Sequence, residues 1–146
     1  MRMDASQSFG SPSFGLSMST FIFVAVTAKC PCTRRILMQT PPHASAACLP
    51  TGACLEDETC RDAAVRLVAN KFGVAVPAYN LIEAGFASQM HGSSHHLTVC
   101  FAFDATNLPA SFDGRGFAWL NPKTFPYSSA TLTQAILLKQ LARSTF

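Results

Sequence analysis

Charged residues are scarce in this chain of 146 residues, of which only 13% are Asp, Glu, Lys or Arg. Because 49% of the residues are apolar, the composition excludes an intrinsically disordered protein. The net charge of +3 arises from scattered basic residues, and Arg34 and Arg35 are the only adjacent pair, so nothing indicates a basic nucleic-acid-binding patch. We therefore expect one folded domain with a large apolar surface, which indicates protein partners in a larger complex.

Paired zinc-binding cysteines are also lacking, since no C-x2-C motif occurs among the six cysteines. A core of this size needs no disulfide bonds, and we interpret the cysteines as reduced and mostly buried thiols. This predicts an intracellular protein, either cytoplasmic or mitochondrial. A P-loop, a Rossmann glycine fingerprint and a Ser/His/Asp order are absent as well, which removes the commonest nucleotide-binding and hydrolase motifs.

No apolar run reaches the ~20 residues that span a membrane, so we expect no membrane segment. The longest, at residues 20–28, has the length of a signal peptide and an A-x-A-like flank, but Asp4 offsets Arg2 in the region before it. Its β-branched and aromatic residues favour a buried strand instead. Residues 1–18 are rich in Ser, Gly and Phe, which predicts a disordered tail or, more weakly, an organelle presequence.

The remaining residues, 19–146, are expected to form a single domain of strands and helices. Strands are predicted at residues 19–26 and 34–40, joined by a tight turn as an antiparallel pair, and a proline-rich loop follows to residue 53. Apolar residues three and four apart predict a helix over residues 57–72, which Gly73 ends. The order is strands, helix, strands, helix, and it indicates a mixed sheet between helices.

In the second half, a buried strand is expected at residues 95–103, with Leu97, Val99, Phe101 and Phe103 on one face. A short strand at residues 117–120 and a closing amphipathic helix at residues 130–144 complete the predicted elements. In that helix we expect Leu132, Ala135, Leu138 and either Leu141 or Ala142 to point inward.

One stretch, GACLEDETCRDAAVRLVANKFGV, has a specific spacing of glycine, acid and arginine. Gly52 is followed after five residues by Glu58 and after seven more by Arg66. Val68, Gly73 and Val74 continue the pattern. Nearby, LPTGACLEDE precedes the helix, two alanines lie within it at residues 63 and 64, and WLNPKTFP follows at residues 119–126.

This stretch resembles the Nudix box, a glycine, five residues, a glutamate, seven residues, then R-E-U-x-E-E-x-G-U, where U is aliphatic. Six of the nine specified positions match, and the flanking segments are similar to those of Nudix domains. The resemblance covers residues 19–143 and implies an α/β/α sandwich with a mixed sheet. It also implies descent from Mg2+-dependent hydrolases of nucleoside diphosphate-linked compounds.

The sequence departs from the box at the glutamates that hold Mg2+ in the family, because Leu67, Asn70 and Lys71 occupy those positions. Gly52, Glu58, Arg66 and Gly73 retain the structural part of the motif, and Glu58 and Arg66 are spaced so that they can form an ion pair. We therefore expect no intact catalytic residues, no metal site and no cofactor. The favoured role is that of a pseudoenzyme, a nucleotide- or RNA-binding or structural subunit of a larger assembly.

The alternative is a divergent active hydrolase that takes Mg2+ ligands from Glu56, Asp57, Glu58 or Asp113. The same acids also have a purely structural interpretation, since carboxylates stabilise the N-terminal end of a helix. Lys71 is either a solvated lysine or a phosphate-binding cation, and Arg115 is the second such candidate. Asp113 also suits a plain Asp-Gly turn.

Three histidines, His91, His95 and His96, lie close together in the sequence MHGSSHH. Metal binding is one interpretation, but Gly92 and the two serines disfavour a helix and no acid or cysteine lies beside them. We therefore predict loop histidines next to a strand.

Overall fold

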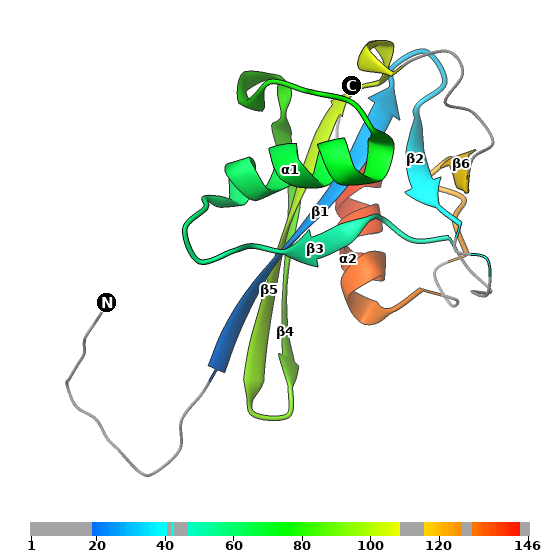
Figure 1. Cartoon of the computed structure of the whole chain (residues 1–146). Coiled ribbons are helices and arrows are strands. Elements are labelled where there is room, and N and C mark those ends of the chain that lie inside the picture. The colour runs from blue at the N-terminus through cyan, green and yellow to red at the C-terminus, as the bar shows by residue number, and fades with distance from the viewer. Residues whose placement is uncertain (1–18, 41, 43–46, 109–115, 127–129, 144–146) are drawn as a thin grey trace.

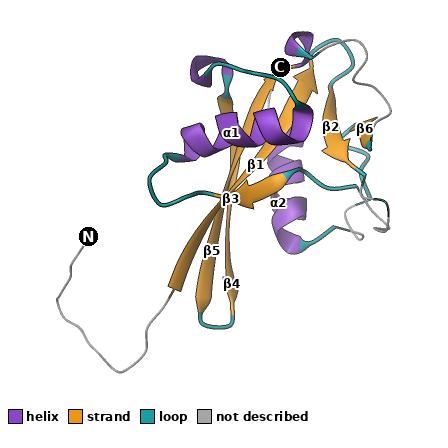
Figure 2. Cartoon of the chain, in the orientation of Figure 1, coloured by secondary structure: helices purple, strands orange, loops and turns teal. Residues whose placement is uncertain are grey.

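The computed structural model of the chain describes residues 19–40, 42, 47–108, 116–126 and 130–143. The predicted tail at residues 1–18 lies outside the described residues. Figure 2 shows the described strands, helices and loops by colour. The elements are, in chain order, β1 (Ser19–Cys30), β2 (Arg35–Gln39), β3 (Thr51–Ala53), α1 (Cys60–Phe72), η1 (Ala78–Asn80), β4 (Ile82–His91), β5 (Ser94–Asp104), η2 (Ala105–Asn107), β6 (Phe117–Leu120) and α2 (Leu132–Arg143).

The six strands form one mixed sheet with the order β4-β5-β1-β2-β6, and β3 pairs with β1 off this path. β1 and β5 run parallel, from Ser19 opposite Ser94 to Lys29 opposite Asp104. All other pairs are antiparallel, including the predicted pair of β1 and β2. The helices α1 and α2 cover opposite faces of this sheet (Figure 1), which confirms the predicted α/β/α sandwich.

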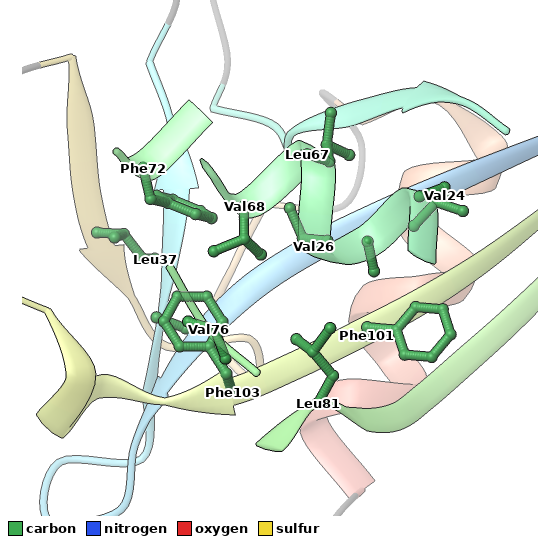
Figure 3. Close-up of a cluster of buried hydrophobic side chains, with 13 residues drawn as sticks. Val24, Val26, Leu37, Leu67, Val68, Phe72, Val76, Leu81, Phe101 and Phe103 are labelled. Atoms are coloured by element: carbon green, nitrogen blue, oxygen red, sulfur yellow. The ribbon is translucent and has the colours of Figure 1, made fainter. Parts of the chain in front are cut away.

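The alternation of side chains along β1 and β5 divides the core into two clusters. Val24 and Val26 of β1 face α1 together with Phe101 and Phe103 of β5, as predicted for that face of β5. Figure 3 shows these side chains packed between the strands and α1. The residues next to them in sequence, such as Ala25 and Cys100, point to the other face and pack against α2.

The helix α2 contacts that second face through Leu137, Leu138 and Leu141. The prediction that Leu132 points inward is wrong, because its side chain is 59% exposed. Helical side chains lean toward the N-terminus of their helix, and Leu132 is the first residue of α2, so no preceding turn lies beneath it. Leu137, which was not predicted, is fully buried instead.

The helix α1 ends where predicted and begins three residues later than predicted. Gly73 has a left-handed φ of 70°, and its N–H donates to the Ala69 carbonyl at 3.0 Å. At the other end Thr59 is the N-cap: its hydroxyl accepts from the N–H of Asp62, and the Asp62 carboxylate accepts from the N–H of Thr59. This capping box fixes the start of α1 at Cys60.

The proline-rich stretch before α1 was predicted to be a loop, and it contains the short strand β3. Gly52 lies opposite Val24 in an antiparallel pair. A strand of three residues has too little sequence to show a period, and its pairing with β1 is a long-range contact.

The outer edge of β4 is covered by the side chain of Gln140 from α2. Its Oε1 accepts from the Phe86 N–H at 2.6 Å, and its Nε2 donates to the Phe86 carbonyl at 2.8 Å. This amide occupies the backbone groups that a further strand would pair with, just past a bulge between Glu83 and Gly85. A Cβ atom added at Gly85 would lie too close to Gln140 Oε1. The two hydrogen bonds between Gln140 and Phe86 therefore require a residue without a side chain at position 85.

All six cysteines are free. Cys100 is buried as predicted, and burial raises the pKa of its thiol to about 12. The prediction that most of the thiols are buried is wrong, because Cys32 is exposed and the other four are half-buried. No helix in the described ranges is long and apolar enough to cross a bilayer.

Candidate functional site

The predicted ion pair between Glu58 and Arg66 is present and bidentate. Arg66 Nη2 donates to Glu58 Oε1 at 2.6 Å, and Arg66 Nε donates to Oε2 at 3.1 Å. Oε1 also accepts from the N–H of Leu55 at 2.9 Å. The guanidinium of Arg66, and after it this N–H, lower the pKa of Glu58.

The same guanidinium connects the helix to the sheet, since Arg66 Nη2 also donates to the Ala53 carbonyl at 2.9 Å. The Glu58–Arg66 pair thereby connects the turn before α1, the end of β3 and the middle of α1. Both of its carboxylate oxygens are already hydrogen-bonded, so its role in this structure is to hold the turn against the helix.

Leu67, at a position where the box has a glutamate, belongs to the core between α1 and the sheet (Figure 3). Its side chain is 5% exposed. It packs against Gly52, where an added Cβ atom would lie only 2.9 Å from Leu67 Cδ1. The glycine of the motif thus allows β3 to lie close to an apolar side chain of α1.

Asn70 and Lys71, at the other two glutamate positions, lie in the last turns of α1. Asn70 is exposed and Lys71 is half-buried. The charge of Lys71 acts on the thiol of Cys48: burial raises the pKa of that thiol, and Lys71 opposes the rise. The second half of α1 therefore carries one amide, one cation and one buried leucine where the family has carboxylates.

These residues do not fit the Mg2+ ion that the fold implies. Mg2+ is held by carboxylate, carbonyl or water oxygens in a near-octahedral arrangement. Leu67 has no such atom, Lys71 repels a cation, and Asn70 offers a single neutral oxygen. In the part of the chain that the structure describes, no group of three His, Cys, Asp or Glu side chains gathers at one place.

Two of the four candidate acids line a groove next to the box. Glu56 and Glu58 line this groove of about 300 Å³, whose opposite wall is the N-terminal part of β1. Asp57 is exposed between them in the sequence. Asp113 and Arg115 lie outside the described residues.

The prediction of loop histidines is wrong for all three residues, because His91 is the last residue of β4 and His95 and His96 lie in β5. A turn at Gly92, with a φ of 63°, makes the two strands a tight hairpin. The ring of His96 stacks on that of His91 with centroids 4.3 Å apart. His95 is hydrogen-bonded to the hydroxyl of Ser88, and alternation along β5 places it on the opposite face from His96.

Two hollows were not predicted from the sequence. One is the groove beside Glu56, and the other, of about 200 Å³, lies where the turn between β1 and β2 meets the end of α2, with Arg34 and Lys123 in its lining. Neither has a sequence signal, because each is formed by segments that are distant along the chain.

No protein-family model and no curated protein matches this sequence. Its structure, however, is similar to many solved structures. One is the MutT Nudix hydrolase from Burkholderia pseudomallei, which is 17% identical, with a TM-score of 0.63 covering 84% of this chain and 98% of the other. Another is the E. coli dihydroneopterin triphosphate pyrophosphohydrolase, also 17% identical, with a TM-score of 0.63 covering 82% and 92%.

A third similar structure is the C-terminal domain of mouse MUTYH, solved in complex with human PCNA. It is 16% identical, and the TM-score is 0.58 over 82% of this chain and 86% of that domain. At these identities the likeness concerns the fold alone. This chain has the Nudix fold.

Proposed function

We propose that this chain is a Nudix-fold pseudoenzyme that acts as a binding or structural subunit of a larger assembly. The observation that carries the proposal is the position of Leu67 in the core, together with Lys71 on the same half of α1. A lysine 4 Å from a metal position would oppose a cation by about 4 kcal/mol per unit charge at an effective dielectric of 20. Hydrolysis of nucleoside diphosphate-linked compounds is therefore absent or very slow.

A role in an assembly is supported by the apolar surface. Four large apolar side chains are between 41% and 50% exposed on two strands that both pair with β5: Phe21 and Ile22 on β1, and Phe86 and Met90 on β4. Apolar surface of this kind is typical of binding sites. The MUTYH domain with a similar structure was solved bound to a protein, which supports a protein-binding role for this fold.

Ligand binding is part of the same proposal. Lys71 and Arg115 are the cations that would contact phosphate in a bound nucleotide or RNA. Lys71 forms no ion pair with a carboxylate among the described residues, so its charge is available to an anionic ligand.

The alternative, an active hydrolase with relocated Mg2+ ligands, has one observation in its favour. Glu56 and Glu58 line the same groove. Against it, Glu58 is bonded to Arg66 through both oxygens, and a metal would have to displace that pair. We favour the pseudoenzyme for this reason.

Purification of the tagged chain from its source under native conditions tests the role in an assembly. We expect it to elute well above its own 15.7 kDa, with at least one other protein in constant ratio across the peak. Mass spectrometry and nuclease treatment of the same fractions identify the protein and any RNA. Elution as a free monomer from gently prepared extracts, with no companion in constant ratio, would overturn the subunit role.

A further inference from the structure

At the N-terminal end of β1, one side of the strand has no partner strand among the described residues. On its other side β1 pairs with β5 from Ser19 onward. On the open side the first residue in register is Phe23, opposite Ala53, and the last backbone bond runs from the Cys54 N–H to the Ile22 carbonyl at 2.9 Å. Among the described residues, nothing pairs with residues 19–21 on that side. In Figure 1 this end of β1 extends beyond both helices.

The direction of the backbone groups follows from the alternation of a strand. The Ile22 carbonyl accepts from the Cys54 N–H, and the Val26 N–H donates to the Pro50 carbonyl. The even-numbered residues of β1 therefore direct their backbone N–H and carbonyl groups to the open side. Thr20 therefore presents an N–H and a carbonyl along the free edge. Its neighbours in sequence direct theirs toward β5.

A groove runs beside this edge because the chain turns away from β1 after Cys54. The groove of about 300 Å³ lies between residues 20–23 of β1 and the turn at residues 53–58. Its walls include Phe21, Ile22 and Leu55, which are 47%, 41% and 54% exposed. A free edge beside an apolar groove is the arrangement to which extended peptides add as a further strand.

The outer edge of β4, unlike this edge of β1, is covered by a side chain. There the Gln140 amide occupies the backbone groups of Phe86, and such covering prevents unwanted strand pairing. The described residues offer no comparable cover for Thr20. In the part of the chain that the structure describes, the edge of β4 is thus covered at Phe86, whereas the edge of β1 at Thr20 is open.

The acidic residues beside the groove favour a basic ligand. Glu56 lines the groove and Asp57 is exposed next to it, and neither forms an ion pair with a described residue. Glu58 is neutralised by Arg66. The rim is therefore acidic beside an apolar floor, which complements a lysine or arginine next to an apolar side chain.

We propose that the free edge of β1 binds an extended segment of a partner protein as an additional strand. An apolar side chain of that segment occupies the groove beside Phe21 and Leu55, and an adjacent basic side chain contacts Glu56 and Asp57. The inference rests on the proposed role in a protein assembly and assigns the surface that this role uses.

A fluorescent ten-residue peptide of alternating isoleucine and lysine is the probe, titrated with the full-length chain and followed by anisotropy. We expect saturable binding that weakens as salt is raised. The same peptide with glutamate in place of lysine should not bind. When the lysine peptide is added, the NMR chemical shifts of the protein should change at residues 20–23 and 53–58.

The Thr20→Pro variant tests the strand pairing, because it removes the N–H on the free edge and no bond to β5. We expect a loss of affinity of roughly tenfold or more. The matched control is Ser19→Pro, one residue away, whose missing N–H faces β5; it should bind the peptide as the parent does. Circular dichroism and thermal unfolding of both variants check that the domain remains folded.

The charge is tested by Glu56→Lys, which should weaken peptide binding by roughly fivefold or more. Its matched control is Glu83→Lys on β4, with the same change in net charge and no expected change in affinity. Because both residues are exposed, these variants keep the test valid even if Thr20→Pro fails to fold.

Absence of peptide binding, or binding that Thr20→Pro and Glu56→Lys leave unchanged, would overturn the proposal. Self-association that Thr20→Pro abolishes would assign the edge to a second copy of this chain instead. Nuclear Overhauser contacts from residues 1–18 to Phe21 in the free protein would assign it to the chain's own N-terminal segment. Each of these outcomes overturns the partner-strand proposal while leaving co-purification of a partner as a separate result.

Discussion

The turn that leads into α1 and the second half of α1 belong to the same Nudix-like stretch, but their side chains have different roles. In the turn, two polar side chains are bonded to α1: Thr59 caps the helix, and Glu58 forms an ion pair with Arg66. In the second half, Leu67 is buried and Asn70 and Lys71 have no carboxylate to offer. The comparison shows that the side chains of the first region stabilise the fold, whereas those of the second offer no carboxylate to a metal ion.

Restoring a glutamate in the second region should have the largest effect. Leu67→Glu places a carboxylate in the core next to Gly52, so we expect a loss of roughly 3–5 kcal/mol in the free energy of unfolding, measured in urea. The control Leu67→Met keeps the apolar contact and should cost less than about 1.5 kcal/mol. A Leu67→Glu variant of near-parental stability would mean that this position is open to solvent, as a metal ligand must be.

Changing the glycine that ends α1 should cost less. Gly73→Ala forces a side chain into the left-handed conformation, and we expect a loss of about 1–2 kcal/mol in unfolding free energy. Gly73→Asn is the matched control and should be milder, since asparagine tolerates this conformation. Equal costs for both variants would show that the left-handed φ is not the reason for glycine.

The ion pair in the first region should make stability depend on pH. The pKa of Glu58 is lower in the folded chain, so its contribution is complete above the unfolded-state value of about 4.3 and disappears as pH falls through the folded-state pKa. Urea unfolding of the parent and of Glu58→Gln at several pH values should give different unfolding free energies only at the higher pH values, where Glu58 is ionised. Arg66→Met should remove the same dependence, and an equal difference at all pH values would refute the assignment.

The smallest expected effect on stability belongs to Lys71. Lys71→Glu should change the unfolding free energy by no more than about 0.5 kcal/mol, because the side chain lies outside the core. If Lys71 contacts phosphate directly, the Lys71→Glu variant should bind ADP-ribose in EDTA several-fold more weakly than the parent chain does, as measured by calorimetry. Lys123→Glu, an exposed lysine outside α1, is the charge-matched control. An equal fall in both variants, or none in either, would exclude a specific role for Lys71.

Much of the fold was predictable because it depends on local pattern. The alternation in β5 and the glycine after Phe72 were sufficient to place a strand and a helix end, and the spacing of Glu58 and Arg66 was sufficient to predict their pairing. The order of elements and the resemblance to the Nudix box then gave the architecture.

The parts that were not predicted depend on contacts between distant segments. β3 exists only because β1 is beside it, and the Gln140 amide meets Phe86 across two elements far apart in sequence. Burial of Leu67 beneath Gly52 is of the same kind. For the candidate site, the sequence therefore showed which residues differ from the motif, and only the structure shows that one of them has become core.

Hydrolysis by the purified full-length chain tests the central claim most directly. With Mg2+ and ADP-ribose, capped RNA or dinucleoside polyphosphates as substrates, we expect product release no faster than in the buffer control. The Glu58→Gln variant should give the same baseline. Robust Mg2+-dependent turnover by the parent chain that Glu58→Gln abolishes would contradict the account.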